Sequence, residues 1–261
     1  MSMNIIKTLW IGPSLSLLEQ LSLKSFLRNG YKVELFIYDE VKNIPEDIII
    51  RDANTILNKE KIFKYRKTGG YGAFANWFRY EMLFKEGGVW VDTDIICLKK
   101  FDIRQDLFFG YEDEDTINNA VIGATPNLPL FEFLSRQAKN PNDFLSYDTF
   151  RQKRIKLKRK YFRGNKRGDL FHGETGPRGL TKAVQHFELD NCALPTQSFY
   201  PVYYRNWSSI FHDPCSSIEE TYPNSYCIHL WNEYIRRSEY NKDGQFEQGT
   251  LIELLKSRYL D

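Results

Sequence analysis

Short apolar runs alternate with turn residues along the first part of this chain, a pattern that predicts alternating strands and helices. Residues 4–10 form an apolar run that stops before Gly12-Pro13, and residues 32–38 form another. Between them, residues 16–28 carry leucines near helical spacing and end at Asn29-Gly30. A strand, a helix and a strand in close succession form a βαβ unit, so this pattern predicts a parallel sheet.

The clearest helix covers residues 74–86, which are rich in apolar side chains and contain neither Gly nor Pro. Gly87-Gly88 ends it, and an extended run at 89–91 leads directly to Asp92. Further strands are predicted at 107–111, 120–124 and 226–231, and further helices at 129–138, from residue 180, and at 249–259. Because the chain has no internal repeat and no low-complexity linker, we expect one α/β domain over residues 1–261.

Composition excludes several classes of protein. The chain has 261 residues, of which 42% are hydrophobic, so wholesale disorder is excluded. The formal net charge is +2, which offers no overall field for nucleic acid. No apolar stretch is long enough to span a membrane, and the first ten residues make a poor signal peptide. The four cysteines form no CxxC motif, which is typical of reduced thiols, so we expect a cytoplasmic protein.

The basic residues are concentrated in one segment of the chain. Residues 151–168 contain ten Lys or Arg and no acid, which leaves 26 basic and 34 acidic residues elsewhere, a net charge of −8. Two interpretations are open: a solvated surface loop or helix, or a peripheral contact with an anionic membrane or a lipid-diphosphate acceptor. Apolar residues among the charges are consistent with an interfacial segment. Nucleic acid is a poorer fit, because no binding motif accompanies the charge.

Asp92 and Asp94 are the sharpest chemical feature. On a strand, residues i and i+2 point to the same face, so we expect the two carboxylates side by side. Mg²⁺ and Mn²⁺ prefer such oxygen ligands and share them with substrate phosphates. The apolar run before Asp92 puts the pair at the carboxyl end of a strand, where open α/β sheets bind ligands. The alternative is a polar strand end whose acids cap turns or pair with Lys99 and Lys100.

Several segments carry a family resemblance. Residues 75–80, Gly87-Gly88 and 90–94 resemble the sugar-binding region of DXD-motif glycosyltransferases of the α-1,4-galactosyltransferase type (glycosyltransferase family 32). Four further segments resemble conserved segments of the bacterial capsule and lipopolysaccharide branch of that family, in the same order: residues 9–12, 175–181, 199–201 and 228–232. The resemblance implies a GT-A fold, a Rossmann-like single domain with a mixed, mainly parallel sheet. Residues 1–105 would bind the nucleotide-sugar and residues 106–261 would face the acceptor.

The resemblance also implies an activity. It is that of a metal-dependent, retaining glycosyltransferase using Mn²⁺ or Mg²⁺, which moves a hexose to a glycan or lipid-linked glycan in surface polysaccharide synthesis. Galactose or N-acetylgalactosamine from a UDP-sugar is the donor we expect by family analogy. Three alternatives stay open: a toxin-like glycosyltransferase that modifies a protein, a metal-dependent phosphoesterase, and a non-catalytic carbohydrate-binding protein.

The resemblance assigns roles to residues of the motif. Asp94 matches the acid that binds the metal, and Asp92 the acid that reaches the ribose and the metal. Asn76 and Arg79 match residues that hold the donor sugar, and their i, i+3 spacing puts them on one helix face. Many members have Asp where this chain has Asn76, so the identity of the sugar is in doubt. Arg79 could instead form a structural ion pair with Glu86 or Asp92.

Further site residues are predicted outside the motif. For the donor we expect Trp10, which in the family stacks on the base, Ile11 beside it, Asn119 with its neighbour Asn118, and Trp231 and Asn232, which close over the donor. His229 completes the metal shell or touches the diphosphate. The acceptor candidates are Asp113, His172 and Glu174. For Trp10 a core position, for His229 a buried structural role, and for Asn118, Asn119 and Asp113 turn chemistry remain the alternatives.

Overall fold

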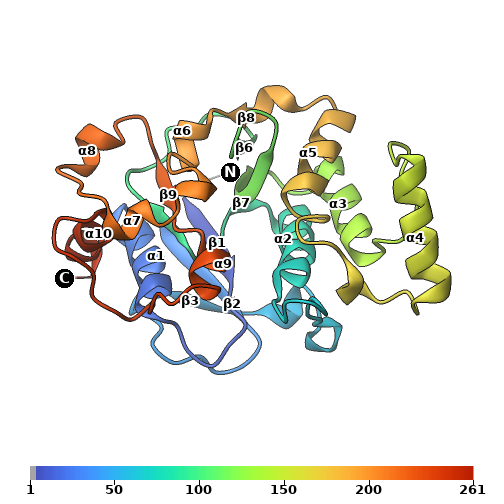
Figure 1. Ribbon diagram of the computed structural model, residues 1–261, viewed down its shortest axis with the longest axis horizontal. Coiled ribbons are helices and arrows are strands. Elements are labelled where there is room, and N and C mark those ends of the chain that lie inside the picture. Colours follow the sequence, from blue (N-terminus) through green and yellow to red (C-terminus); the bar gives the residue numbers. More distant parts are fainter. Residues whose placement is uncertain (1–3, 261) are drawn as a thin grey trace.

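A seven-stranded sheet forms the centre of the protein in the computed structural model, which describes residues 4–260 (Figure 1). In spatial order the strands are β3 (Ile49–Asp52), β2 (Lys32–Ile37), β1 (Ile5–Leu9), β4 (Gly88–Val91), β7 (Ile117–Ala124), β6 (Leu107–Tyr111) and β8 (Ala193–Leu194). The first four are parallel, β7 runs antiparallel to both β4 and β6, and β8 is parallel to β6. The sheet is therefore mixed and mainly parallel, as the sequence predicts.

A separate two-stranded sheet brings the C-terminal third of the chain to the end of β4. It pairs β5 (Ile95–Cys97) with β9 (Cys227–His229) in antiparallel register, with Ile95 opposite His229. The strand predicted at 226–231 is shorter than expected because Trp231 adopts a left-handed conformation, with φ of 58°, and starts helix α9 (Asn232–Arg236). This pairing decides which C-terminal residues reach the acidic motif.

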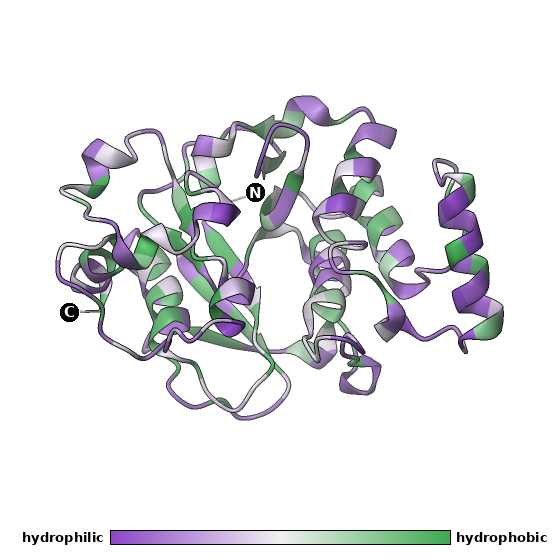
Figure 2. Ribbon diagram, viewed as in Figure 1, coloured by the Kyte–Doolittle hydropathy of each residue, from purple (hydrophilic) through white to green (hydrophobic). Residues whose placement is uncertain are grey.

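Helices cover both faces of the large sheet. Helices α1 (Leu17–Arg28) and α10 (Leu251–Tyr259) contribute to one apolar core, and α2 (Gly72–Glu86), α3 (Pro129–Lys139) and α5 (Pro177–His186) contribute to the other. The hydrophobic residues gather on the strands and on the helix faces turned toward them (Figure 2). The remaining helices are α4 (Phe150–Phe162) and the short α6 (Thr196–Phe199), α7 (Ser209–His212) and α8 (Ile218–Thr221). Within residues 4–260, no helix combines the length and apolar character needed to cross a membrane.

The helix boundaries have local causes. Ser16 begins α1 with a capping box in which Glu19 accepts from the Ser16 backbone N–H at 2.9 Å. Gly87 ends α2 at a φ of 61°, and a Cβ there would lie 2.7 Å from the nitrogen of Pro126. Only glycine therefore fits at this position, and the chain can turn directly from α2 into β4 and the acidic motif.

Some elements differ from the predictions. The basic segment resolves into helix α4, which ends at Phe162, followed by a short turn. Strand β7 and helix α5 each begin three residues earlier than expected, at Ile117 and Pro177. Strands β3, β5 and β8 were not predicted, because β3 is a largely exposed edge strand and β5 and β8 have only three and two residues. The expectation of one domain over residues 1–261, and of its two halves, stays a prediction.

Candidate active site

The predicted donor residues follow two strands at the point where the strand order of the sheet changes direction. β1 pairs with β2 on one side and with β4 on the other, and all three are parallel. The carboxyl ends of β1 and β4 therefore lie at the same edge, next to the crevice where doubly wound sheets bind ligands. Trp10 and Ile11 follow β1, and Asp92 follows β4.

Asp92 and Asp94 lie in a tight turn between β4 and β5. Strand β4 ends at Val91, and the Ile95 backbone N–H donates to the carbonyl of Asp92 at 3.1 Å. The prediction that both acids sit on a strand is therefore wrong, because the chain must turn here to reach β5. Burial raises the pKa of Asp92, and the charge of Asp94 adds to this rise.

Asp92 is held by helix α2 and by the preceding strand, β4. Arg79, on α2 and only 3% exposed, donates to Asp92 Oδ1 at 2.5 Å. The indole N–H of Trp90 donates to the same oxygen at 2.8 Å, and the Arg79 guanidinium lies 4.9 Å from the Trp90 ring centroid. Of the two ion-pair partners considered for Arg79, the structure shows Asp92; Glu86 pairs instead with Lys7 and Arg51.

A buried amide cluster lies beside this ion pair. Asn119 donates through Nδ2 to Asn76 Oδ1 at 2.9 Å and to the Tyr80 hydroxyl at 3.1 Å. Tyr80 donates in turn to the carbonyl of Thr175 at 3.0 Å, and Asn76 lies 3.4 Å from both Arg79 Nη1 and Thr175 Oγ1. Asn76 and Asn119 are 7% and 4% exposed. The structure therefore joins three predicted donor residues from α2 and β7 into one polar surface.

Asp94 is held by the C-terminal third of the chain. His229 Nε2 lies 3.1 Å from Asp94 Oδ2, and the Asn232 backbone N–H donates to the same oxygen at 2.8 Å. Burial alone would raise the pKa of Asp94, but His229 and the Asn232 N–H together hold it below its ordinary value. For His229 burial acts to lower the pKa, and the charges of Asp94 and Asp92 outweigh it and raise that pKa.

Trp231 supports this arrangement from behind. Its ring lies 4.1 Å from the His229 ring, centroid to centroid, and its indole N–H donates to the carbonyl of Val202 at 2.9 Å. Trp231 is only 7% exposed, whereas Trp10 is partly buried, with an indole nitrogen that has no partner among the described residues. The donor contacts expected for Trp10, Ile11, Trp231 and Asn232 stay predictions.

The two carboxylates suit a hard divalent cation. Within the described part of the chain, no hydrogen bond or ion pair reaches Asp92 Oδ2 or Asp94 Oδ1, so one oxygen of each acid is free. No three His, Cys, Asp or Glu side chains of residues 4–260 form a ready-made metal site. A cation here would thus use few protein ligands and complete its shell with water and phosphate oxygens, as Mg²⁺ and Mn²⁺ commonly do. His229 contacts Asp94 through Nε2, which suits it to orienting that carboxylate.

The acceptor candidates lie in different settings, and within residues 4–260 no side-chain hydrogen bond or ion pair joins them to this cluster. Asp113 accepts from the backbone N–H groups of Asp115 and Thr116, which is turn chemistry. His172 is exposed, and Glu174 forms a two-pronged ion pair with Arg159, at 2.9 and 2.6 Å. Their acceptor roles stay predictions.

Two carboxylates near the site were missed from the sequence. Glu112 accepts from the buried Asn118 at 2.5 Å, and burial raises its pKa. The acidic run 112–115 pointed to this place, but the structure joins Glu112 to Asn118, whereas Asp113 bonds to the backbone of its own turn. Glu19 is 1% exposed and accepts from Asn232 at 3.2 Å and Lys242 at 2.7 Å. The S-x-x-E spacing marks Glu19 only as a helix-capping residue, because its partners near the site, Asn232 and Lys242, are more than 200 residues away.

Comparison with known proteins agrees with this geometry. Residues 19–117 match the glycosyltransferase sugar-binding region containing the DXD motif, and residues 149–259 match the alpha 1,4-glycosyltransferase conserved region. Fold and acidic motif together define a glycosyltransferase of the GT-A class. Within that class the chain is similar to the DXD-motif glycosyltransferases of the alpha-1,4-glycosyltransferase type, whose two conserved regions match it in order. The predictions of family and fold class are confirmed.

Individual relatives are distant. The chain is 26% identical over 167 residues to mouse lactosylceramide 4-alpha-galactosyltransferase, covering 59% of this chain and 39% of that protein. It is 23% identical over 202 residues to human alpha-1,4-N-acetylglucosaminyltransferase, covering 69% and 51%. The chain therefore spans about half, or less, of these relatives. The ligand-free glycosyltransferase domain of the YGT toxin has a similar fold, with a TM-score of 0.50, 10% identity, and coverage of 80% and 83%.

Proposed function

We propose that this protein is a metal-dependent glycosyltransferase that moves a hexose from a nucleotide-sugar to a glycan or lipid-linked glycan in surface polysaccharide synthesis. The observation that carries this proposal is the pair of free carboxylate oxygens, Asp92 Oδ2 and Asp94 Oδ1, beside the buried cluster of Asn76, Arg79 and Asn119. The carboxylate oxygens suit a cation that carries the diphosphate, and the buried cluster offers amide and guanidinium groups to sugar hydroxyls.

Each residue then has a definable task. Asp94 and Asp92 would hold Mn²⁺ or Mg²⁺, which when bound neutralises the departing diphosphate. His229 and the Asn232 N–H fix the orientation of Asp94, and Arg79 with Trp90 fixes that of Asp92. Preorganised groups of this kind cost little reorganisation during the reaction.

We further propose galactose or its N-acetylated relative as the sugar and retention of the anomeric configuration. The names of two relatives specify alpha-linked products, one of galactose and one of N-acetylglucosamine. UDP-hexoses of this series carry the sugar in alpha linkage, so an alpha-linked product means retention. Proton NMR of the product linkage tests this part, and a beta linkage would overturn it.

We also propose that helix α4 contacts an anionic membrane surface on the cytoplasmic side. Its outward face carries the exposed side chains of Phe150, Leu157 and Tyr161, which are 78%, 40% and 70% exposed, together with exposed Arg154 and Lys158. These five positions share one face of a helix. Apolar and basic groups on one exposed face are typical of interfacial helices. The four cysteines are free thiols, which supports the cytoplasmic setting.

The decisive experiment compares donor turnover by Asp94→Asn and Asp115→Asn, with Mn²⁺ and with a chelator. Asp115 lies in the exposed turn after β6, so the control removes the same charge outside the site. We expect Asp94→Asn to lose at least about 100-fold in turnover, about 2.7 kcal/mol of transition-state stabilisation. Full metal-dependent turnover by Asp94→Asn would overturn the assignment.

The same assay separates the alternatives. A panel of UDP-galactose, UDP-N-acetylgalactosamine, UDP-N-acetylglucosamine and GDP-mannose identifies the donor. Release of inorganic phosphate from simple esters without a nucleotide requirement would indicate a phosphoesterase. Transfer to protein instead of glycolipid would indicate a toxin-like enzyme, and glycan binding unaffected by the chelator, without turnover, would indicate a carbohydrate-binding protein.

A further inference from the structure

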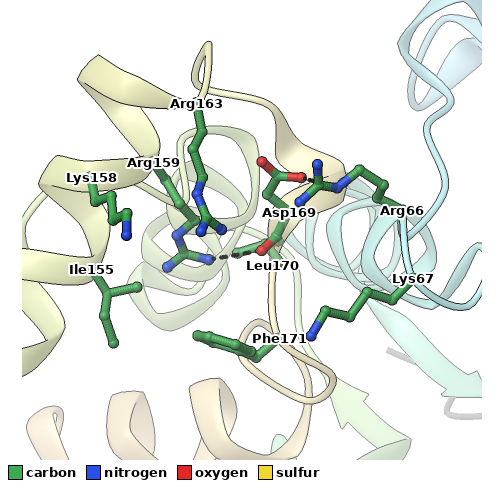
Figure 3. A pocket seen from close by; sticks show the side chains of 10 residues that line it. Arg66, Lys67, Ile155, Lys158, Arg159, Arg163, Asp169, Leu170 and Phe171 are labelled. Carbon is green, nitrogen blue, oxygen red and sulfur yellow. Dashed lines mark hydrogen bonds and ion pairs between the residues drawn. The ribbon is translucent and has the colours of Figure 1, made fainter.

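A strongly basic pocket lies outside the donor site, between helix α4 and two loops. Its volume is about 240 Å³, and Figure 3 shows the side chains that line it. Lys158, Arg159 and Arg163 come from α4 and the residue after it, and Arg66 and Lys67 come from the opposite side (Figure 3). Five cations thus converge on one cavity.

The positive charge of this pocket is only partly neutralised. Asp169, the one acid in its lining, pairs with Arg66 at 2.8 Å, and Glu174 pairs with Arg159. No ion pair within residues 4–260 reaches Lys67, Lys158 or Arg163. Five cations against two carboxylates leave an excess of three positive charges around the cavity.

Arg159 provides a second and independent observation. It is only 4% exposed, and its Nε is buried without a hydrogen-bond partner among the described residues. An unsatisfied buried donor destabilises the fold, so such groups are commonly bonded to a ligand or an ordered water molecule. The apolar side chains of Leu170 and Phe171 form part of the wall, and apolar walls strengthen the attraction between the cations and an anion.

We propose that this pocket binds the phosphate or diphosphate group of a ligand. Arg163 offers a planar fork of N–H donors that matches phosphate oxygens, and Arg159, whose fork is bound by Glu174, offers its unpaired Nε–H. Lys67 and Lys158 add point charges. A carboxylate ligand would neutralise only one of the three excess charges, whereas a phosphate ester or diphosphate neutralises two or three. The pocket is too basic and too poor in acids for a cation.

The pocket is connected to the donor site through one short turn. Phe171 lines the pocket, Glu174 holds Arg159, and the next residue, Thr175, contacts Asn76 and Tyr80 in the amide cluster. If the protein is the transferase proposed above, a phosphate bound here belongs to the acceptor. The phosphate assignment itself does not depend on that activity. The phosphate can come from a lipid headgroup or from a soluble ester.

Binding of inorganic phosphate and pyrophosphate, measured by calorimetry with a chelator present and at constant ionic strength, tests the pocket. The test variant is Lys67→Ala/Arg163→Ala, and the control is Lys32→Ala/Arg104→Ala. All four side chains are exposed, and the control pair lies outside both the pocket and helix α4. Neither variant removes a buried contact, so both should fold, and thermal unfolding without ligand checks this.

We expect the wild type and the control to bind pyrophosphate equally and the test variant to bind it at least about tenfold more weakly. Equal binding by the test variant, or an equal loss in the control, would overturn the proposal. Turnover of the donor with water and Mn²⁺ is measured on the same samples. Because both variants keep the donor site, a failure of the phosphate pocket and a failure of the proposed activity give different results.

Vesicles distinguish the two sources of phosphate. Phosphatidylcholine vesicles contain either phosphatidic acid, a phosphate monoester, or phosphatidylserine, matched for surface charge. Stronger retention of the wild type on phosphatidic acid, lost in the test variant and kept in the control, supports a lipid headgroup in the pocket. Equal retention on both vesicles, together with pyrophosphate binding in solution, supports a soluble phosphate ester as the ligand.

Discussion

The ion pair between Arg79 and Asp92 allows the site geometry to be tested without knowing the substrate. The perturbation is a double-mutant cycle of Arg79→Met, Asp92→Asn and the double variant. Methionine keeps much of the side-chain volume over Trp90 while removing the charge. The free energy of unfolding is measured by urea denaturation at pH 7 with a chelator present.

The expected coupling energy follows from burial. Removing one partner of a fully buried pair costs about 3–5 kcal/mol, and a hydrogen bond to a charged group contributes about 1.5–3 kcal/mol. Arg79 is 3% exposed, but the Asp92 side chain is 31% exposed, so water recovers part of the loss. We therefore expect a coupling of about 2 kcal/mol. The partly exposed pair of Arg236 and Glu233, at i and i+3 on a helix, is the control and should couple by less than about 0.5 kcal/mol.

A pH series sharpens the test. With Arg79 removed, burial raises the pKa of Asp92 with no opposing guanidinium. A carboxyl whose pKa is higher in the folded state stabilises the fold at low pH and loses that contribution as pH rises. The stability deficit of Arg79→Met relative to the double variant should thus grow from about pH 4 upward. Additive single effects, within about 0.5 kcal/mol, would refute the buried pair.

Two further predictions concern the metal-free fold. The pKa of Asp94 is lowered and that of His229 raised, so their attraction is complete between about pH 4 and about pH 6.5 and disappears as His229 loses its proton. The free energy of unfolding of wild type and of Asp94→Asn, measured in urea with a chelator, should therefore differ more at pH 5.5 than at pH 8.5. A difference that stays constant with pH would contradict this. Gly123→Ala places a Cβ 2.0 Å from the ring of Phe108, which is 1% exposed, so overpacking should lower the free energy of unfolding by about 1–3 kcal/mol or more. The control is Gly70→Ala, where a Cβ meets nothing closer than 3.7 Å. Equal melting temperatures for the two variants would rule out the clash.

Much of the fold could be predicted from local pattern. The βαβ start, helix α2 and its glycine end, and strands β4 and β6 follow from apolar spacing and from turn residues. Strand β3 could not, because it is an exposed edge strand whose pairing with β2 stabilises it more than burial does. The end of β9 also depends on tertiary structure, since a left-handed Trp231 is tolerated only where surrounding packing holds it.

The candidate site shows the same division. Sequence spacing alone placed Asn76 and Arg79 on one helix face and the acidic pair after a buried strand, because both relations span only a few residues. It could not decide that Arg79 pairs with Asp92 and not with Glu86, because that choice depends on the rotation of α2 over β4. Nor could it show Glu19 behind Asn232, whose contact crosses 213 residues.

By itself, then, the sequence determined the element types, the family and the identity of the acidic motif, because each depends on short-range order along the chain. Tertiary structure decided that Asp92 and Asp94 lie in a turn, that His229 reaches Asp94 through the pairing of β5 with β9, and that the basic segment becomes one wall of a pocket. These outcomes depend on which distant elements pack together, and side chains from separate parts of the chain supply the energy that selects them.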